Sequence, residues 1–335
     1  MNKKTFLIFS ILSLVLVIAF IGPVINNSQN NNDLLKLVIN RFPKTGSDGN
    51  ITEVKLTTEL PNVPEKIMVY KVKKPNLSME KVRETARKLG IEGEIKENNI
   101  DLRVKSDKGE YIIDKVTGSE NFMTKEFELQ HEPLKTILSD EKYKNLAIEF
   151  LNKKGLMKDK AVFIDVNKDN TVTTIDKNGN EKTMPFMIEV RFGREDLNNL
   201  SFNGVGPKIS VYFGDNGKII GVGSVWREVE PYMEYPIVSP SKGIEQIKNN
   251  NAVVFNVTRN DVATVKNMKL MYISDPINYD QEFIIPHYIV TGTNTSGKSF
   301  TGLTKAISKE YIQEKDPVSK IKNVPTNHEK KRTKN

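Results

Sequence analysis

The sequence contains no cysteine, one tryptophan and three histidines among 335 residues. Without cysteine the chain forms no disulfide framework, no thiolate metal site and no lipoprotein attachment point. The histidines, His131, His287 and His328, are too widely spaced for an ordinary zinc cluster. We therefore expect domains held together by packing alone, with no metal and no other cofactor.

Local signatures of catalysis are also missing, because neither GxSxG nor HExxH occurs. We expect no catalytic residue and no enzyme activity. A catalytic pair of carboxylates needs no local motif, so an enzyme remains the alternative from another functional class.

One stretch matches the phosphate-binding pattern GxxxxGKS, from Gly292 to Ser299. A phosphate loop needs a helix immediately after the serine, whereas residues 299–302 have the pattern of a strand. The stretch therefore predicts a hairpin turn rather than a nucleotide site.

A second stretch, Asp165 to Asp176, has the oxygen spacing of a calcium loop at its first, third and fifth positions. Its sixth position is Asn170 where glycine is needed, and its last is Asp176 in place of a bidentate glutamate. A hairpin explains the same residues, and we expect no metal here.

The N-terminus carries a long uncharged run from about Phe6 to Ile21, preceded by Lys3 and Lys4. Its length approaches the ~20 residues that cross a bilayer, and the lysines favour a cytoplasmic N-terminus. The run predicts a transmembrane signal-anchor over residues 1–25, which would place the body outside the cell membrane. A cleaved signal peptide is the alternative.

The rest of the chain divides by composition. The expected parts are a stalk or linker (26–63), a first module (64–125), a second module (138–235), a third module (236–312) and a basic disordered tail (313–335).

Each module combines one short capped helix with alternating strands. Ser78, Ser139 and Ser239 are expected helix N-caps, and Gly155 is expected to end the second helix. Helices and strands are segregated along the chain, so the sequence predicts an α+β fold of tandem small antiparallel modules behind a transmembrane helix.

Three segments carry a resemblance to known families: SDEKYKNLAIEFLNKKGL from Ser139, SPSKGIEQI from Ser239 and IPHYIVTGTNTSGKSFTGLTKAI from Ile285. Over about residues 64–310 the chain resembles PepSY-type modules and the membrane-anchored YycH/YycI-like regulators. The resemblance implies a non-catalytic extracytoplasmic protein that binds a sensor kinase, an enzyme or a peptide. It transfers no functional residue.

The only tryptophan lies in SVWREVEPYMEY. Rigid aromatic rings beside charged groups are typical anchors of binding surfaces. We take Trp226, Arg227, Tyr232 and Tyr235 as a candidate partner-binding set, with a buried core tryptophan as the alternative.

The formal net charge is +8 at pH 7. For a protein outside the membrane, the acidic partners are lipid headgroups and anionic wall polymers rather than nucleic acid. The sequence thus predicts a membrane-anchored, extracytoplasmic regulatory protein that binds a protein or peptide partner in the cell envelope. The alternatives are an envelope-associated enzyme or its accessory subunit, and an adhesin for anionic wall polymers.

Overall fold

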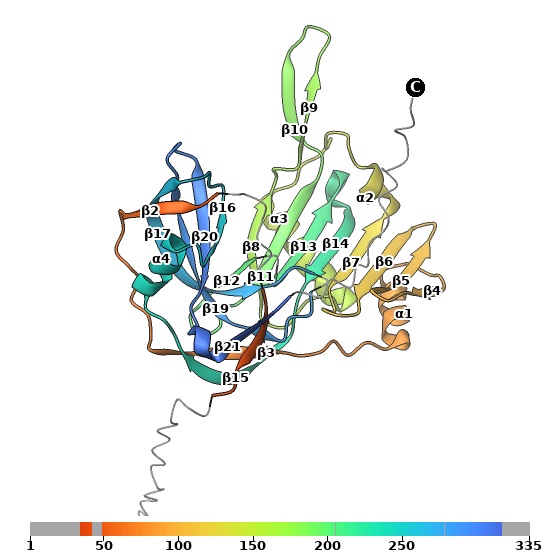
Figure 1. The fold of residues 1–335 in the computed structure, drawn as a ribbon. Coiled ribbons are helices and arrows are strands. Elements are labelled where there is room, and N and C mark those ends of the chain that lie inside the picture. The colour runs from red at the N-terminus through yellow and green to blue at the C-terminus, as the bar shows by residue number, and fades with distance from the viewer. Residues whose placement is uncertain (1–33, 42–48, 205, 278, 317–335) are drawn as a thin grey trace, which may run out of the picture. The chain divides into compact units, whose positions relative to one another are not determined.

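The computed structural model describes residues 34–41, 49–204, 206–277 and 279–316 (Figure 1). The chain separates into two units between Leu35 and Lys36, and the fold described below belongs to the second unit.

The largest sheet has eight strands in the order β4-β5-β6-β7-β14-β13-β11-β8, and every neighbouring pair is antiparallel. In that order the strands are Ile95–Glu97, Asp101–Ser106, Gly109–Asp114, Glu120–Thr124, Ile219–Val225, Lys208–Phe213, Ile188–Arg194 and Ala161–Asn167.

Helix α3 (Asp140–Lys154) contacts β8 and β11 of this sheet. The Ser139 hydroxyl accepts a hydrogen bond from the Lys142 N–H, and Gly155 ends the helix in the left-handed conformation at φ 70°. Both ends agree with the sequence prediction. The fully buried residues Tyr143, Ala147 and Leu151 are four apart, which places them on one helix face.

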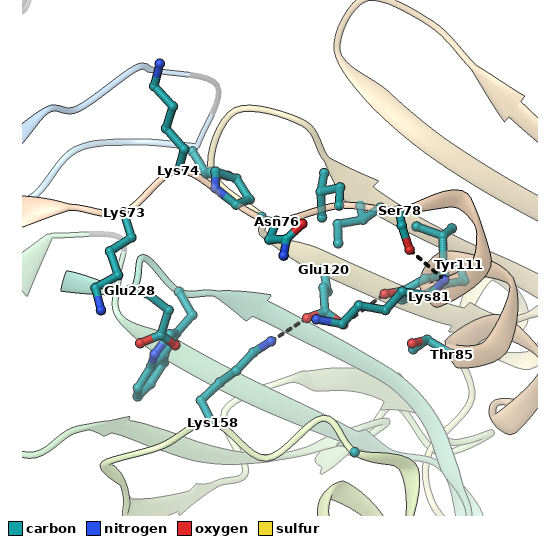
Figure 2. Close-up of a pocket in the computed structure, with 18 residues that line it drawn as sticks. Lys73, Lys74, Asn76, Ser78, Lys81, Thr85, Tyr111, Glu120, Lys158 and Glu228 are labelled. Carbon is teal, nitrogen blue, oxygen red and sulfur yellow. Dashed lines mark hydrogen bonds and ion pairs between the residues drawn. The ribbon is translucent and has the colours of Figure 1, made fainter.

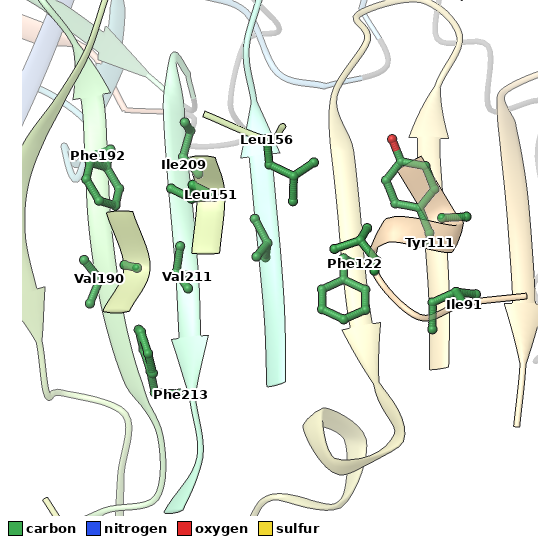
Figure 3. Close-up of a cluster of buried hydrophobic side chains, with 14 of the residues drawn as sticks. Ile91, Tyr111, Phe122, Leu151, Leu156, Val190, Phe192, Ile209, Val211 and Phe213 are labelled. Carbon is green, nitrogen blue, oxygen red and sulfur yellow. The ribbon is translucent and has the colours of Figure 1, made fainter. Parts of the chain in front are cut away.

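The core between helices and sheet follows the two-residue period of the strands (Figure 3). Val190 and Phe192 of β11 and Ile209, Val211 and Phe213 of β13 are buried on the face towards the helices. Burying each such side chain stabilises the fold by about 1.5–3 kcal/mol relative to exposure. Helix α1 (Met79–Lys88) contacts β5 and contributes Val82 and Ala86 to the same core.

A second sheet has six strands, five of them in the order β12-β17-β19-β20-β16, with β2 also paired to β17. In chain order the strands are β2 (Ile51–Leu56), β12 (Phe202–Gly204), β16 (Val253–Phe255), β17 (Asp261–Ser274), β19 (Pro286–Thr293) and β20 (Ser299–Lys305). Helix α4 (Pro240–Lys248) contacts β2 and β20, and its N-cap is Ser239 as expected.

Three smaller sheets and three short helical segments complete the described structure. In the first of these sheets the central strand β3 (Lys66–Val72) pairs with β15 (Val229–Pro236) and with β18 (Phe283–Ile284). The other two sheets pair β1 (Leu37–Asn40) with β21 (Ile312–Lys315), and β9 (Thr171–Ile175) with β10 (Glu181–Pro185). The helical segments are α2 (Lys125–Leu129), η2 (Asp215–Gly217) and η3 (Lys309–Tyr311).

The predicted α+β fold of tandem small modules is wrong, because strands far outweigh helices among the described residues. They hold twenty-one strands and four α-helices, and Lys36–Asn335 forms one unit. Strand β7 of the expected first module pairs with β14 of the expected second, with Phe122 opposite Val222. Residue alternation shows which face of a strand is buried, but not which strand lies beside it.

The predicted membrane topology is also corrected. Against the predicted single-pass anchor and extracytoplasmic body, no helix within the described ranges is both long enough and apolar enough to span a bilayer. The predicted anchor at residues 1–25 lies outside the described residues, as does most of the predicted basic tail.

Candidate functional site

The four predicted partner-binding residues do not form an exposed surface. Trp226 is 3% exposed, Arg227 4% and Tyr235 0%. Tyr232 is half-buried, and its ring lies 5.0 Å from that of Phe283. The core alternative for the tryptophan therefore fits its burial.

Arg227 connects the end of β14 to the chain that follows β17. Its guanidinium donates to the Ser274 hydroxyl at 2.9 Å and to the carbonyl oxygens of Asp275, Pro276 and Tyr279 at 2.8–3.1 Å. Burial lowers the pKa of this guanidinium. The residue therefore holds the fold together and is not available to a partner.

Tyr235 is similarly enclosed. Its ring lies 5.8 Å from that of Tyr311, and burial raises the pKa of its phenol to about 12.

A pocket of about 390 Å³ lies where the chain between β3 and α1 passes the large sheet (Figure 2). We call it the lysine pocket. It is lined by Lys73, Lys74, Pro75, Asn76, Leu77, Ser78, Lys81, Val82, Thr85, Tyr111, Ile113, Thr117, Gly118, Glu120, Gly155, Lys158, Trp226 and Glu228.

Cations outnumber anions around the lysine pocket. Four lysines but only two glutamates, Glu120 and Glu228, line it. Lys73 also lies 3.4 Å from Glu230, where both side chains are about half exposed, so that pair contributes little. Lys74 and Lys81 have no ion-pair partner in the described part of the chain. The pocket is therefore suited to an anionic ligand.

Glu120 of β7 lies at the centre of the only interactions drawn across the pocket in Figure 2. One of its carboxylate oxygens accepts the Tyr111 hydroxyl at 2.9 Å, and the other pairs with the Lys158 ammonium. Burial, and then the negative charge of Glu120, raise the pKa of the Tyr111 phenol well above its usual range. Tyr111 therefore stays neutral and remains a hydrogen-bond donor.

The Trp226 ring forms an aromatic part of the pocket wall. Arg194, which does not itself line the pocket, packs against this ring. The Arg194 guanidinium lies 4.6 Å from the indole centroid and 3.7 Å from Glu228. The indole N–H is buried and has no acceptor among the residues that the structure describes.

The first turn of α1 borders the pocket. The Ser78 hydroxyl accepts from the Lys81 N–H, as expected of an N-cap. A helix N-terminus carries a partial positive charge, which adds to that of the Lys81 side chain.

The pocket also bears on the enzyme alternative, because a cleft lined by two carboxylates is a feature of many hydrolases. Both oxygens of Glu120 already have partners, and Glu228 lies beside Arg194. The geometry thus shows two carboxylates in one pocket, each with a positively charged neighbour.

The calcium-like stretch is divided between two structural elements. Asp165 of β8 forms a bidentate pair with Arg191, which lowers the pKa of its carboxyl group. Asp176 accepts from the backbone N–H groups of Asn178 and Asn180 at the β9–β10 turn. Within the part of the chain that the structure describes, no three His, Asp or Glu side chains are close enough to share a metal ion.

The GxxxxGKS match is a hairpin turn, as predicted. β19 and β20 pair up to Thr293 and Ser299, and the Asn294 carboxamide accepts the backbone N–H of Lys298. His287, in β19, is buried and its imidazole lies 3.1 Å from the Ile285 carbonyl. His131 lies 6.3 Å from the Phe186 ring, and His328 is outside the described residues.

Sequence reasoning missed the pocket residues Lys81, Glu120 and Lys158. They come from a helix, a strand and a connecting segment that are far apart in the sequence, and they share no motif. The only local signals were the Lys73–Lys74 pair and the cap at Ser78, neither of which indicates what lies opposite.

No family model and no curated protein matches the chain. Among solved structures, a crystal structure of an uncharacterized protein from Eubacterium rectale is similar, with a TM-score of 0.43 and 11% sequence identity over 79% of this chain and 90% of that one. A likeness of this size supports no statement about function, and the resemblance to PepSY and YycH/YycI-like proteins stays a prediction.

Proposed function

We propose that the protein is a non-catalytic binding protein that recognises an acidic segment of a protein or peptide partner at the lysine pocket. The observation that carries the proposal is the excess of lysine over glutamate around the pocket. Opposite charge steers a partner to its site and fixes its orientation.

The size and walls of the pocket fit this role. Its volume is at the lower end of the roughly 300–1,000 Å³ of ligand sites, which suits one or two side chains of a larger partner. The apolar lining of Leu77, Val82, Ile113 and Trp226 can take an apolar residue beside an acidic one.

The only tryptophan supplies the test, because Trp226 is part of the pocket wall. Its emission is followed while the protein is titrated with acetyl-Glu-Leu-Phe-Glu-amide or with acetyl-Lys-Leu-Phe-Lys-amide. We expect saturation with the acidic peptide only, and weaker binding as salt is raised from low to about 0.3 M.

Variant proteins locate the site. Lys74→Gln is expected to weaken binding of the acidic peptide two- to threefold. Lys269→Gln removes the same charge from an exposed position on β17 and is expected to have no effect. Equal responses to the two peptides, or no response to either, would reject the proposed function.

The enzyme remains a second candidate because Glu120 and Glu228 line the same pocket. Mass spectrometry of the acidic peptide after incubation with the protein separates the two functions. A binding protein returns the peptide intact. Product formation that is lost in both Glu120→Gln and Glu228→Gln would favour the enzyme.

A further inference from the structure

The centre of the lysine pocket has two ammonium groups for one carboxylate. In Figure 2 the side chains of Lys81, from α1, and Lys158, from the connection between α3 and β8, extend towards Glu120. Lys158 is paired with Glu120, whereas Lys81 has no ion-pair partner among the residues described. The positive charge of Lys81 is therefore uncompensated beside the Lys158–Glu120 pair.

We infer that Lys81 and Lys158 form a subsite for one carboxylate group, and that Glu120 is an internal competitor for it. The inference rests on the proposed function and names the group that is recognised. The carboxylate comes from an aspartate or glutamate side chain of the partner or from the partner's C-terminus, since both present the same chemistry.

Glu120 shows which chemistry this position accepts. Its carboxylate is held by an ammonium group and by a neutral tyrosine hydroxyl, and charge-assisted hydrogen bonds of this kind are the stronger ones in proteins. Its side chain is 13% exposed and that of Lys158 is 20% exposed, so water screens the pair less than a surface pair. An incoming carboxylate would meet Lys81 and share Lys158 with Glu120.

The first turn of α1 adds to the attraction for an anion. The first N–H groups of a helix have no partner within the helix, and the Ser78 hydroxyl accepts only that of Lys81. The indole N–H of Trp226, another wall residue, is buried and also lacks an acceptor among the described residues.

The neighbouring wall sets the sequence that would follow the carboxylate. Leu77, Val82 and Ile113 line the pocket together with the Trp226 ring. A partner segment with one acidic group next to a leucine or phenylalanine would therefore fit better than a run of acidic residues. In such a run, the additional carboxylates would lie against the apolar wall of the pocket.

Three short probes test the subsite through Trp226 emission. They are acetyl-Ala-Leu-Phe with a free C-terminal carboxylate, the same peptide as its C-terminal amide, and acetyl-Leu-Glu-Phe-amide, whose only carboxylate is a side chain. We expect the amide without any carboxylate to bind at least tenfold more weakly than the better of the other two. Which of those two binds more tightly identifies the source of the carboxylate.

Two variants then act in opposite directions. Lys81→Gln is expected to weaken binding of the carboxylate probes about tenfold and to leave binding of the uncharged amide unchanged. Lys269→Gln, which removes a positive charge elsewhere, is the control. Glu120→Gln is expected to increase the affinity for the same probes several-fold, because it removes the competing carboxylate. The new carboxamide oxygen can still accept the hydrogen bond from the Tyr111 hydroxyl. Glu245→Gln, at an exposed position on α4, removes the same charge elsewhere and is the control for net charge.

The outcomes separate this inference from the proposed function. If acetyl-Glu-Leu-Phe-Glu-amide binds but neither a missing carboxylate nor Lys81→Gln changes affinity, the subsite is rejected and the binding function stands. If no probe changes Trp226 emission, both are rejected. Should Glu120→Gln lower the melting temperature markedly, the comparison of Lys81→Gln with Lys269→Gln decides alone.

Discussion

The guanidinium of Arg194 lies 4.6 Å from the centroid of the Trp226 ring, and the side chain of Arg194 is only 5% exposed. The same guanidinium donates to the Arg227 carbonyl at 2.9 Å. One residue at the end of β11 thus fixes both the aromatic wall of the lysine pocket and the first residues after β14.

Replacing Arg194 with methionine should therefore destabilise the protein by about 2–4 kcal/mol. The change removes a desolvated cation–π contact of about 2 kcal/mol and leaves the Arg227 carbonyl without this donor. Urea unfolding followed by circular dichroism measures the loss, and Trp226 emission should change in the folded state. A stability within 0.5 kcal/mol of the wild type would show that the stacking contributes little.

Arg227→Met is expected to cost about 3–5 kcal/mol. The methionine is of similar length, but it leaves the Ser274 hydroxyl and three carbonyl oxygens without their shared donor in a buried place. The matched control is Arg259→Met at an exposed position, for which we expect a change below about 0.5 kcal/mol. Similar losses for the two variants would contradict the structural role of Arg227.

His287 should make the protein less stable as the pH falls below neutral. Burial, assisted by the charge of Lys305, lowers the pKa of the imidazole to about 3, whereas the unfolded chain has a pKa of about 6.5. Between these values the unfolded state binds a proton that the folded state does not. Unfolding free energy therefore falls as pH drops from 6.5 towards 3, by about 2 kcal/mol between pH 6.5 and 5.

Chemical denaturation of the wild type and of His287→Asn at pH 7, 6 and 5 measures this contribution. The variant should lose less stability over that range. His131→Asn, at an exposed position, should show the same dependence of unfolding free energy on pH as the wild type. Parallel slopes for wild type and His287→Asn would show that the buried histidine is not the cause.

At the GxxxxGKS turn, Lys298→Ala should change stability by no more than about 0.5 kcal/mol, because the lysine side chain is exposed. Asn294→Ala should cost clearly more, about 1–3 kcal/mol, since its carboxamide donates to the Asn256 carbonyl and accepts from Ser296 and Lys298. Thermal melting compares the two. A large effect of Lys298→Ala, or ATP binding that it abolishes, would contradict the hairpin interpretation.

Local features of the fold were readable from the sequence because their causes are local. A serine hydroxyl caps the helix that begins a few atoms away, as at Ser139 and Ser239, and Gly155 ends α3 because it tolerates a positive φ. The turn at Gly297 was predictable for the same reason. The two-residue period along β11 likewise accounts for the burial of Ile188, Val190 and Phe192 on one face of the strand.

The sequence alone thus determined the caps, the turns and the buried faces, together with an excess of positive charge. Only the tertiary structure decided that β7 pairs with β14, that Trp226 and Arg227 are interior, and that Lys81, Glu120 and Lys158 meet in one pocket. Those outcomes depend on which distant segments lie side by side. Hydrophobic burial rewards any arrangement that covers apolar surface, so it is the packing of the whole chain that selects one.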